Sequence, residues 1–215
     1  MKHITKIYGL EWHIRNGEIL AEDRGAVIVS NHQSVLDITG LNNAWYLVQK
    51  LFLIVKKEVI YTGPLGIATY LCGCLFIDRK KPKEANQILE STVQLMIRDK
   101  IKIWIFPEGT RNTKWDGKFL PFKKGAFNLA VNAQVPILPV VYSPYYFIDK
   151  HNYVFNKGHV IMQCLEPVIT TGLTLDDVPA LAERVHLTMF RTFEQLSKEV
   201  QSQTSNDDRK NTKLC

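Results

Sequence analysis

Short apolar runs alternate along the chain with longer segments whose apolar residues recur at helical spacing. The apolar runs with the length and composition of strands are residues 10–14, 26–30, 51–55, 74–77, 101–106, 137–142 and 159–164. The segments with helical periodicity are residues 35–48, 65–72, 83–98, 125–133 and 178–200. Strands separated by helices are typical of an α/β fold. We therefore predict a single domain with a mixed, largely parallel central sheet flanked by helices.

The end of the chain differs in composition from the rest. Residues 201–215 are polar and mixed in charge, and they lack the apolar stripe of residues 178–200. A segment with few apolar residues buries too little surface to offset the entropy of ordering it. We therefore predict one domain over residues 1–200 and a disordered polar tail over residues 201–215.

The charge of the chain favours anionic partners. Hydrophobic residues make up 46% of the sequence and charged residues 22%, and the net charge is +6. An excess of this size suits phosphorylated metabolites, coenzyme A or an anionic membrane face, and a mildly basic surface with no single partner explains it equally well. Nucleic acid is the least favoured partner, because no aromatic stacking motif is interleaved with the basic residues.

Cysteine spacing points to free thiols rather than to metal binding or disulfides. The four cysteines are Cys72, Cys74, Cys164 and Cys215. No CxxC pair or histidine-rich ligand cluster accompanies them, so neither a zinc site nor a disulfide framework is supported. We expect buried thiols in a reducing compartment.

One uncharged stretch, residues 59–77, has the length of a membrane-spanning helix. Thr62-Gly63-Pro64, Gly66 and Gly73 interrupt it, which predicts a turn, a short helix and a strand. We interpret the stretch as buried core, with a membrane-dipping helix as the alternative. The first residues of the chain do not have the apolar core of a signal peptide.

Candidate chemistry begins directly after the strand at residues 26–30, where His32 stands five positions before Asp37. Five positions in a regular helix are about 140° apart, so the two side chains can pair only if His32 lies in a strand-to-helix turn and Asp37 in the first helical turn. Ser34 is a suitable N-cap for that helix. A histidine held by a carboxylate can take a proton from an alcohol near neutral pH. The alternative is that these residues only cap the helix, with Asp37 complementing its dipole.

Other assignments for this segment are weaker. Ser34 is not in a nucleophile elbow, because the Gly-x-Ser-x-Gly pattern is absent. One histidine and one aspartate are too few ligands for a metal ion, so we predict no metal site.

Basic loops follow other strands of the predicted sheet. Pro107 ends the run at residues 101–106, Gly109 permits a tight turn, and Arg111 can hold a phosphate with two parallel hydrogen bonds. Arg79 follows the run at residues 74–77. Each loop alone is compatible with a solvated surface turn. Because sites gather beyond the carboxyl ends of parallel strands, we expect the loops to lie near His32 and Asp37.

Four segments in order carry a specific resemblance. They are residues 31–37, with the pattern NHxxxxD, residues 73–79, residues 106–111 and residues 135–140. They resemble the signature motifs of the glycerolipid acyltransferase family, and most closely those of eukaryotic 1-acyl-sn-glycerol-3-phosphate acyltransferases of the alpha and beta type. The resemblance extends over residues 8–200.

The resemblance implies transfer of an acyl chain from acyl-CoA to the sn-2 hydroxyl of lysophosphatidic acid, which forms phosphatidic acid. It implies that His32 is the general base and Asp37 its orienting partner. The implied substrate-binding residues are Lys57, Arg79, Glu108, Gly109, Thr110, Arg111 and Pro136. Of these, Arg79 and Arg111 would hold the phosphate, Glu108, Gly109 and Thr110 would shape the acceptor pocket, and Pro136 would line the acyl site. Acyl-CoA would be a co-substrate, and no cofactor is expected.

Family members carry an apolar N-terminal membrane anchor, and the residues before His32 form no such helix. The chain therefore resembles a short form, a fragment, or a protein that holds the membrane by its surface, and we expect its active-site set to remain competent. The resemblance implies the endoplasmic reticulum membrane. Alternatives are an acyltransferase for glycerol 3-phosphate or another lysophospholipid, and a non-catalytic lipid-binding form. Neither the preferred acyl chain nor the oligomeric state can be inferred from these residues.

Overall fold

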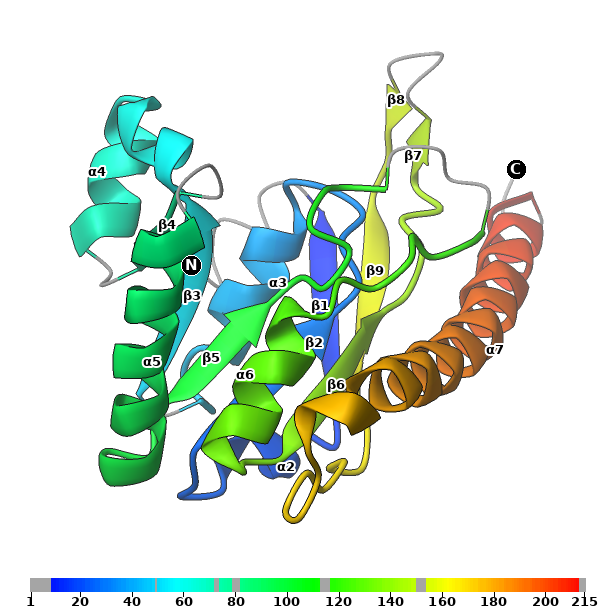
Figure 1. Cartoon of the computed structure of the whole chain (residues 1–215). Coiled ribbons are helices and arrows are strands. Elements are labelled where there is room, and N and C mark those ends of the chain that lie inside the picture. The colour runs from blue at the N-terminus through cyan, green and yellow to red at the C-terminus, as the bar shows by residue number, and fades with distance from the viewer. Residues whose placement is uncertain are drawn as a thin grey trace.

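The computed structural model describes residues 9–48, 50–71, 74–78, 82–112, 117–149 and 154–212. Its centre is a seven-stranded sheet with the order β1–β9–β6–β2–β5–β3–β4 (Figure 1). The strands are β1 (Leu10–Arg15), β2 (Ala26–Ser30), β3 (Leu51–Lys56), β4 (Leu75–Ile77), β5 (Lys102–Ile105), β6 (Ile137–Tyr142) and β9 (Gly158–Cys164). All neighbouring pairs are parallel except β6 and β9. The predicted mixed, largely parallel sheet is confirmed.

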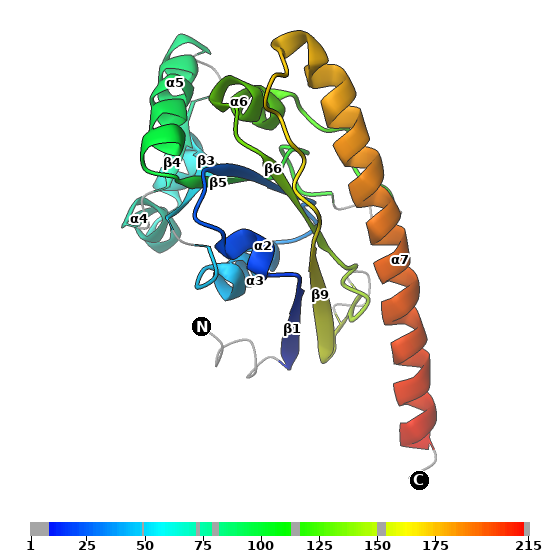
Figure 2. The ribbon, with the colours of Figure 1, turned by 90° about the horizontal axis from the view of Figure 1, so that it is seen from below.

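Helices cover both faces of the sheet. Helices α5 (Pro82–Arg98), α6 (Gly125–Ala133) and α7 (Val178–Thr212) lie on one face, and α2 (Glu18–Ala21) and α3 (Asp37–Ala44) lie on the other (Figure 2). Strand β2 is buried throughout because it has a layer on each side. Val27 and Val29 join the core under α6 and α7, whereas Ala26 and Ile28 join the core under α2 and α3. This alternation follows from the two-residue period of a strand.

The remaining elements are short. They are the 3-10 helices η1 (Lys57–Tyr61) and η2 (Leu175–Asp177), helix α4 (Pro64–Leu71) and a small hairpin of β7 (Ile148–Asp149) and β8 (Val154–Phe155). Helix α2, both 3-10 helices and the hairpin were not predicted, because elements of two to five residues carry no usable periodicity.

Helix α7 differs from the prediction at its end. It continues to Thr212, whereas the helical pattern predicted an end at residue 200. Among the residues of α7 whose burial is described, Val200 is the last buried one. No glycine or proline follows Pro179 before Thr212, so nothing in the sequence stops the helix at residue 200. The division into a domain and a disordered tail at residue 200 remains a prediction.

The uncharged stretch at residues 59–77 is divided as predicted, into the end of η1, helix α4 and strand β4. Its interpretation as buried core is wrong for η1 and α4, because Tyr61 is 79% exposed and Leu71 is 77% exposed. Strand β4 lies at the edge of the sheet, and the apolar side chains of Ile67, Tyr70 and Leu71 on α4 are exposed in the part of the chain that the structure describes. Within the described ranges, no helix is both long and apolar enough to cross a membrane.

Two of the four cysteines can be placed. Cys74 and Cys164 are buried free thiols, as predicted. Burial raises the pKa of the Cys164 thiol to about 12, which keeps it protonated and unreactive. Cys72 and Cys215 lie outside the described residues.

Candidate active site

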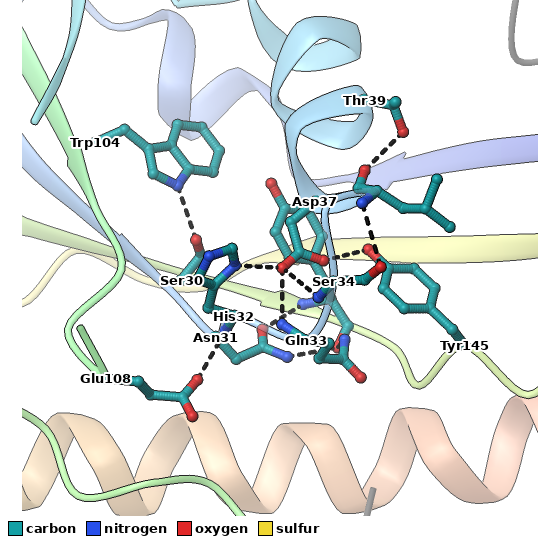
Figure 3. Close-up of polar contacts among 12 residues, drawn as sticks. Ser30, Asn31, His32, Gln33, Ser34, Asp37, Thr39, Trp104, Glu108 and Tyr145 are labelled. Carbon is teal, nitrogen blue, oxygen red and sulfur yellow. Dashed lines mark hydrogen bonds and ion pairs between the residues drawn. The ribbon is translucent and has the colours of Figure 1, made fainter. Parts of the chain in front are cut away.

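His32 and Asp37 form a hydrogen-bonded couple at the carboxyl end of β2. His32 lies in the loop between β2 and α3, and Asp37 is the first residue of α3 (Figure 3). The distance between His32 Nδ1 and Asp37 Oδ2 is 2.6 Å. This is the geometry that the five-residue spacing required, so the predicted pairing is confirmed.

Asp37 also organises the loop that carries His32. Its Oδ2 accepts hydrogen bonds from the amides of Gln33 (2.7 Å) and Ser34 (3.0 Å), and the side chain is fully buried. Ser34 is not the N-cap, because α3 begins at Asp37 and Ser34 Oγ accepts only the amide of Leu36 (3.3 Å). Asp37 therefore fixes both the imidazole and the backbone of the loop.

The loop after β5 holds His32 from the other side. The His32 amide donates to Glu108 Oε1 (2.7 Å), and the His32 carbonyl accepts from the Asn112 amide (2.7 Å). The imidazole stacks on Phe106 with ring centroids 4.0 Å apart. The His32 side chain is 18% exposed, and its Nε2 makes no hydrogen bond to any described residue. One ring nitrogen is therefore fixed by Asp37 while the other is open to a substrate.

Glu108 is buried, and its carboxylate connects two loops. It is 2% exposed, and its second oxygen accepts the Leu120 amide (3.0 Å). Burial raises the pKa of the Glu108 carboxyl, and the hydrogen bonds from the His32 and Leu120 amides partly offset that rise. Its observed contacts are thus to backbone amides. Whether it also shapes an acceptor pocket, as the resemblance implied, remains a prediction.

The other implied binding residues are distributed unevenly. Gly109 has φ of +72° and its amide closes a turn on the Phe106 carbonyl (3.0 Å), which confirms the predicted tight turn. Thr110 and Arg111 are exposed on the same loop, and Lys57 opens η1 directly after β3. These residues reach the carboxyl edge of the sheet that His32 occupies. Arg79 lies outside the described residues.

Pro136 is not brought to this edge. It precedes β6, and its carbonyl accepts the amide of Val27, near the start of β2 (3.0 Å). Since β2 and β6 are parallel, Pro136 lies at the amino ends of the strands, opposite His32. The role of Pro136 in the wall of the acyl site, which the resemblance implied, remains a prediction.

Two cavities flank the His32 loop. An apolar cavity of about 310 Å³ opens beside Phe106, between the ends of β3, β4 and β5 and the start of α6; it is lined by Ile54, Ile77, Ile105, Phe106, Lys123 and Ala126 among others. A cavity of about 200 Å³ lies between the His32 loop and α7; it is lined by Gln33, Glu108, Asn112, Phe119, Phe193 and Ser197 among others. Phe106 therefore separates the imidazole from the apolar cavity.

Sequence reasoning missed residues that support the site. The Tyr145 hydroxyl donates to Asp37 Oδ1. Asn31 bridges β2 and β6, because its side chain donates to the Tyr142 carbonyl (3.1 Å) and accepts the Tyr142 amide (2.8 Å). Tyr145 follows the carboxyl end of β6 by three residues, so the strand-end rule that found His32 could also have found it.

No metal centre is found in the described part of the chain: it has no group of three or more histidine, cysteine, aspartate or glutamate side chains that could hold an ion.

Comparisons with known proteins agree with this architecture. The family model described as Acyltransferase matches residues 11–143. The chain is 46% identical to human 1-acyl-sn-glycerol-3-phosphate acyltransferase beta, over 89% of this chain and 68% of that one. It is 42% identical to the human alpha protein, over 91% of this chain and 68% of that one.

A solved structure has the same fold. The crystal structure of the 1-acyl-sn-glycerophosphate (LPA) acyltransferase PlsC from Thermotoga maritima matches with a TM-score of 0.68 and 28% identity, and it covers 91% of this chain and 76% of that one. With a family model over residues 11–143 and close relatives along most of its length, the chain belongs to the acyltransferase family of enzymes.

Proposed function

We propose that this enzyme transfers an acyl chain from acyl-CoA to the sn-2 hydroxyl of lysophosphatidic acid, which yields phosphatidic acid and free coenzyme A. The relatives named above as 1-acyl-sn-glycerol-3-phosphate acyltransferases support this choice of acceptor. The observation that carries the proposal is the His32 ring, which is held by Asp37 through Nδ1 and whose Nε2 has no hydrogen bond to a described residue.

In the proposed reaction His32 is the general base. Its Nε2 removes the proton from the acceptor hydroxyl as the oxygen attacks the thioester carbonyl, and Asp37 stabilises the imidazolium that forms. Collapse of the tetrahedral intermediate breaks the carbon–sulfur bond, and the thiolate of coenzyme A takes the proton back from His32. A thioester is already activated, so the proposed reaction requires neither a covalent enzyme intermediate nor a cofactor.

The basic loops supply a phosphate grip in this proposal. Arg111 is exposed one residue from Asn112, whose amide holds the His32 carbonyl. A guanidinium can bind a phosphate with two parallel hydrogen bonds. Lys57 would add positive charge at the same edge, and Arg79 would act as the resemblance implies.

The apolar cavity beside Phe106 is the proposed site of the acyl chain. Phe106 lines the cavity on one face and stacks on the imidazole with the other, and Lys123 also lines the cavity, so an apolar tail can enter beside the base while polar groups stay near the rim. At Gly125, which lines the cavity and begins α6, an added Cβ meets no atom within 4 Å. A Gly125→Leu variant should therefore keep its activity with short acyl donors and lose it selectively with long ones. An unchanged chain-length profile would contradict this placement.

The exposed apolar surface of η1 and α4 is the proposed membrane contact. Tyr61, Ile67, Tyr70 and Leu71 are 62–79% exposed there. Residues 59–71 contain no charged side chain, and tyrosine suits the bilayer interface. An Ile67→Glu, Leu71→Glu double variant should lose binding to phosphatidylcholine vesicles. Ile97→Glu on α5, where Ile97 is 57% exposed, is the matched control and should bind like wild type. Association with the endoplasmic reticulum membrane is part of the same proposal, and fluorescence microscopy of the tagged chain tests it.

A panel of acceptors tests the proposed function. Purified protein is incubated with acyl-CoA and one acceptor, and thiol release and lipid products are followed. We expect lysophosphatidic acid to give phosphatidic acid at a rate far above glycerol 3-phosphate and lysophosphatidylcholine. Preference for either of those acceptors would redirect the assignment. Binding of lysophosphatidic acid without turnover would support a non-catalytic form.

A further inference from the structure

The carboxylate of Asp37 is held at both oxygens. Oδ2 faces His32 and two backbone amides, whereas Oδ1 accepts the hydroxyl of Tyr145 (Figure 3). Tyr145 is 0% exposed and comes from the segment after β6, far from the His32 loop in sequence. Burial, and then the negative charge of Asp37, raise the pKa of the Tyr145 phenol well above its usual value. The phenol therefore remains a hydrogen-bond donor at any working pH.

The ring of Tyr145 is placed by apolar packing that does not depend on its hydroxyl. It meets Trp12 edge-on at a centroid distance of 6.5 Å and Phe147 at 5.8 Å. Replacing the hydroxyl by hydrogen leaves these contacts in place. Tyr145→Phe therefore removes the hydrogen bond from the hydroxyl to Asp37 Oδ1 and keeps the packing of the ring.

Tyr142 provides a matched comparison. It is also fully buried and meets Trp12 edge-on at 5.8 Å, but its hydroxyl finds no hydrogen-bond partner among the described residues. The two phenols thus share an apolar pocket near Asp37, and only one of them touches the carboxylate.

We propose that Tyr145 is a positioning residue that fixes the Asp37 carboxylate and lowers the basicity of His32 through it. Donation to Oδ1 draws negative charge away from Oδ2, so the carboxylate stabilises the imidazolium less. His32 then stays unprotonated, and able to act as a base, to lower pH. This inference rests on the proposed function only in the role of His32 as the base.

The other titratable groups that face the pair do not change in the comparison. Glu108 approaches from the loop after β5 and contacts His32 through its backbone amide. Tyr142 approaches from β6 without a bond to Asp37. Both remain in Tyr145→Phe, so a change in the titration of His32 reports the lost hydroxyl.

Nuclear magnetic resonance titration of the His32 ring in the free protein tests this directly, because it requires no substrate. We expect the titration midpoint to move to higher pH in Tyr145→Phe and to stay at the wild-type value in Tyr142→Phe. Substitution of Tyr145 by 4-aminophenylalanine, which keeps a donor at the same place, should bring the titration midpoint part of the way back to the wild-type value. A wild-type midpoint in Tyr145→Phe, or equal shifts in both phenylalanine variants, would overturn the proposal.

Kinetics on the same variants separate this inference from the proposed function. In Tyr145→Phe we expect kcat at pH 7 to fall by about 10-fold, in line with one hydrogen bond to a charged group. KM should change by less than about twofold, because the residue touches no substrate. The acidic limb of kcat/KM should move to higher pH. If the protein is inactive on lysophosphatidic acid, the proposed acceptor is wrong. The titration of the His32 ring would still decide whether Tyr145 acts on His32 through Asp37.

Discussion

The charge of Asp37 can be removed while its shape is kept. In Asp37→Asn the amide oxygen can still accept from the Gln33 and Ser34 amides and from the His32 ring, but it does so as a neutral group. Hydrogen bonds to a charged acceptor contribute about 1.5–3 kcal/mol and those to a neutral one about 0.5–1.5 kcal/mol. These three weakened bonds amount to about 3 kcal/mol. The fourth bond, from the Tyr145 hydroxyl to Oδ1, is replaced by a contact with the amide nitrogen, and relief of the buried charge offsets part of the loss. We expect a net loss of about 1–3 kcal/mol in the free energy of unfolding.

The effect on catalysis should be much larger than the effect on stability. Asparagine cannot stabilise the imidazolium, and it can hold the ring in the wrong tautomer. The same change in a Ser-His-Asp triad lowers kcat by about 10⁴-fold. We expect a fall of about 10³–10⁴-fold in kcat, with a Tm lower by about 3–10 °C. The assay is thiol release from acyl-CoA at a temperature well below the Tm, together with a thermal melt.

A surface aspartate serves as the control. Asp99 is partly exposed and pairs with its neighbour Arg98 at 2.7 Å, so Asp99→Asn should leave both kcat and Tm nearly unchanged. If Asp37→Asn keeps more than about a tenth of the wild-type kcat while its Tm falls, Asp37 only holds the loop. A role of Asp37 in proton transfer by His32 would then be refuted.

Other predictions concern the buried Glu108, phosphate binding by Arg111 and the absence of a cofactor from the proposed reaction. Burial raises the pKa of the Glu108 carboxyl, so the folded state binds this proton more tightly than the unfolded chain. The free energy of unfolding of the wild type, relative to Glu108→Gln, should therefore fall as pH rises above the ordinary carboxyl pKa. A difference in stability that does not change with pH would contradict this. Arg111→Ala should raise KM for lysophosphatidic acid by about 10-fold or more and leave KM for acyl-CoA unchanged. Arg191→Ala, on the exposed side of α7, is the control and should change neither KM. Equal effects of the two variants would exclude phosphate binding by Arg111. Dialysis against EDTA should leave the rate of thiol release unchanged, and a loss restored by added divalent ion would contradict the proposed reaction.

Much of the fold could be predicted because its signals are local. Strands β2 and β6 and helix α6 have the predicted bounds, since their apolar runs are bordered by polar or turn residues. Helix α3 is shorter than predicted, because Asp37 ties up the amides of Gln33 and Ser34 and the regular helix starts only after them. The exposure of α4 could not be predicted either, since apolar composition does not say whether another layer covers a helix.

The candidate site was predictable only in part, for a related reason. His32 and Asp37 are close in sequence, so their spacing contains the geometry of their pair. Tyr145 reaches Asp37 across 108 positions, and only the pairing of β2 with β6 brings them together. Pro136 was assigned from a resemblance between motifs, which does not show at which end of a strand a residue lies.

The most direct test of the account is acyl transfer by the full chain with His32 replaced by alanine. Asp37 keeps its bonds to the Gln33 and Ser34 amides and to Tyr145 in that variant, so the loop should remain folded. With acyl-CoA and lysophosphatidic acid, we predict a kcat lower by about 10²–10⁴-fold and a thermal melt close to that of wild type. Wild-type turnover by the folded His32→Ala protein would contradict the central claim that His32 is the base.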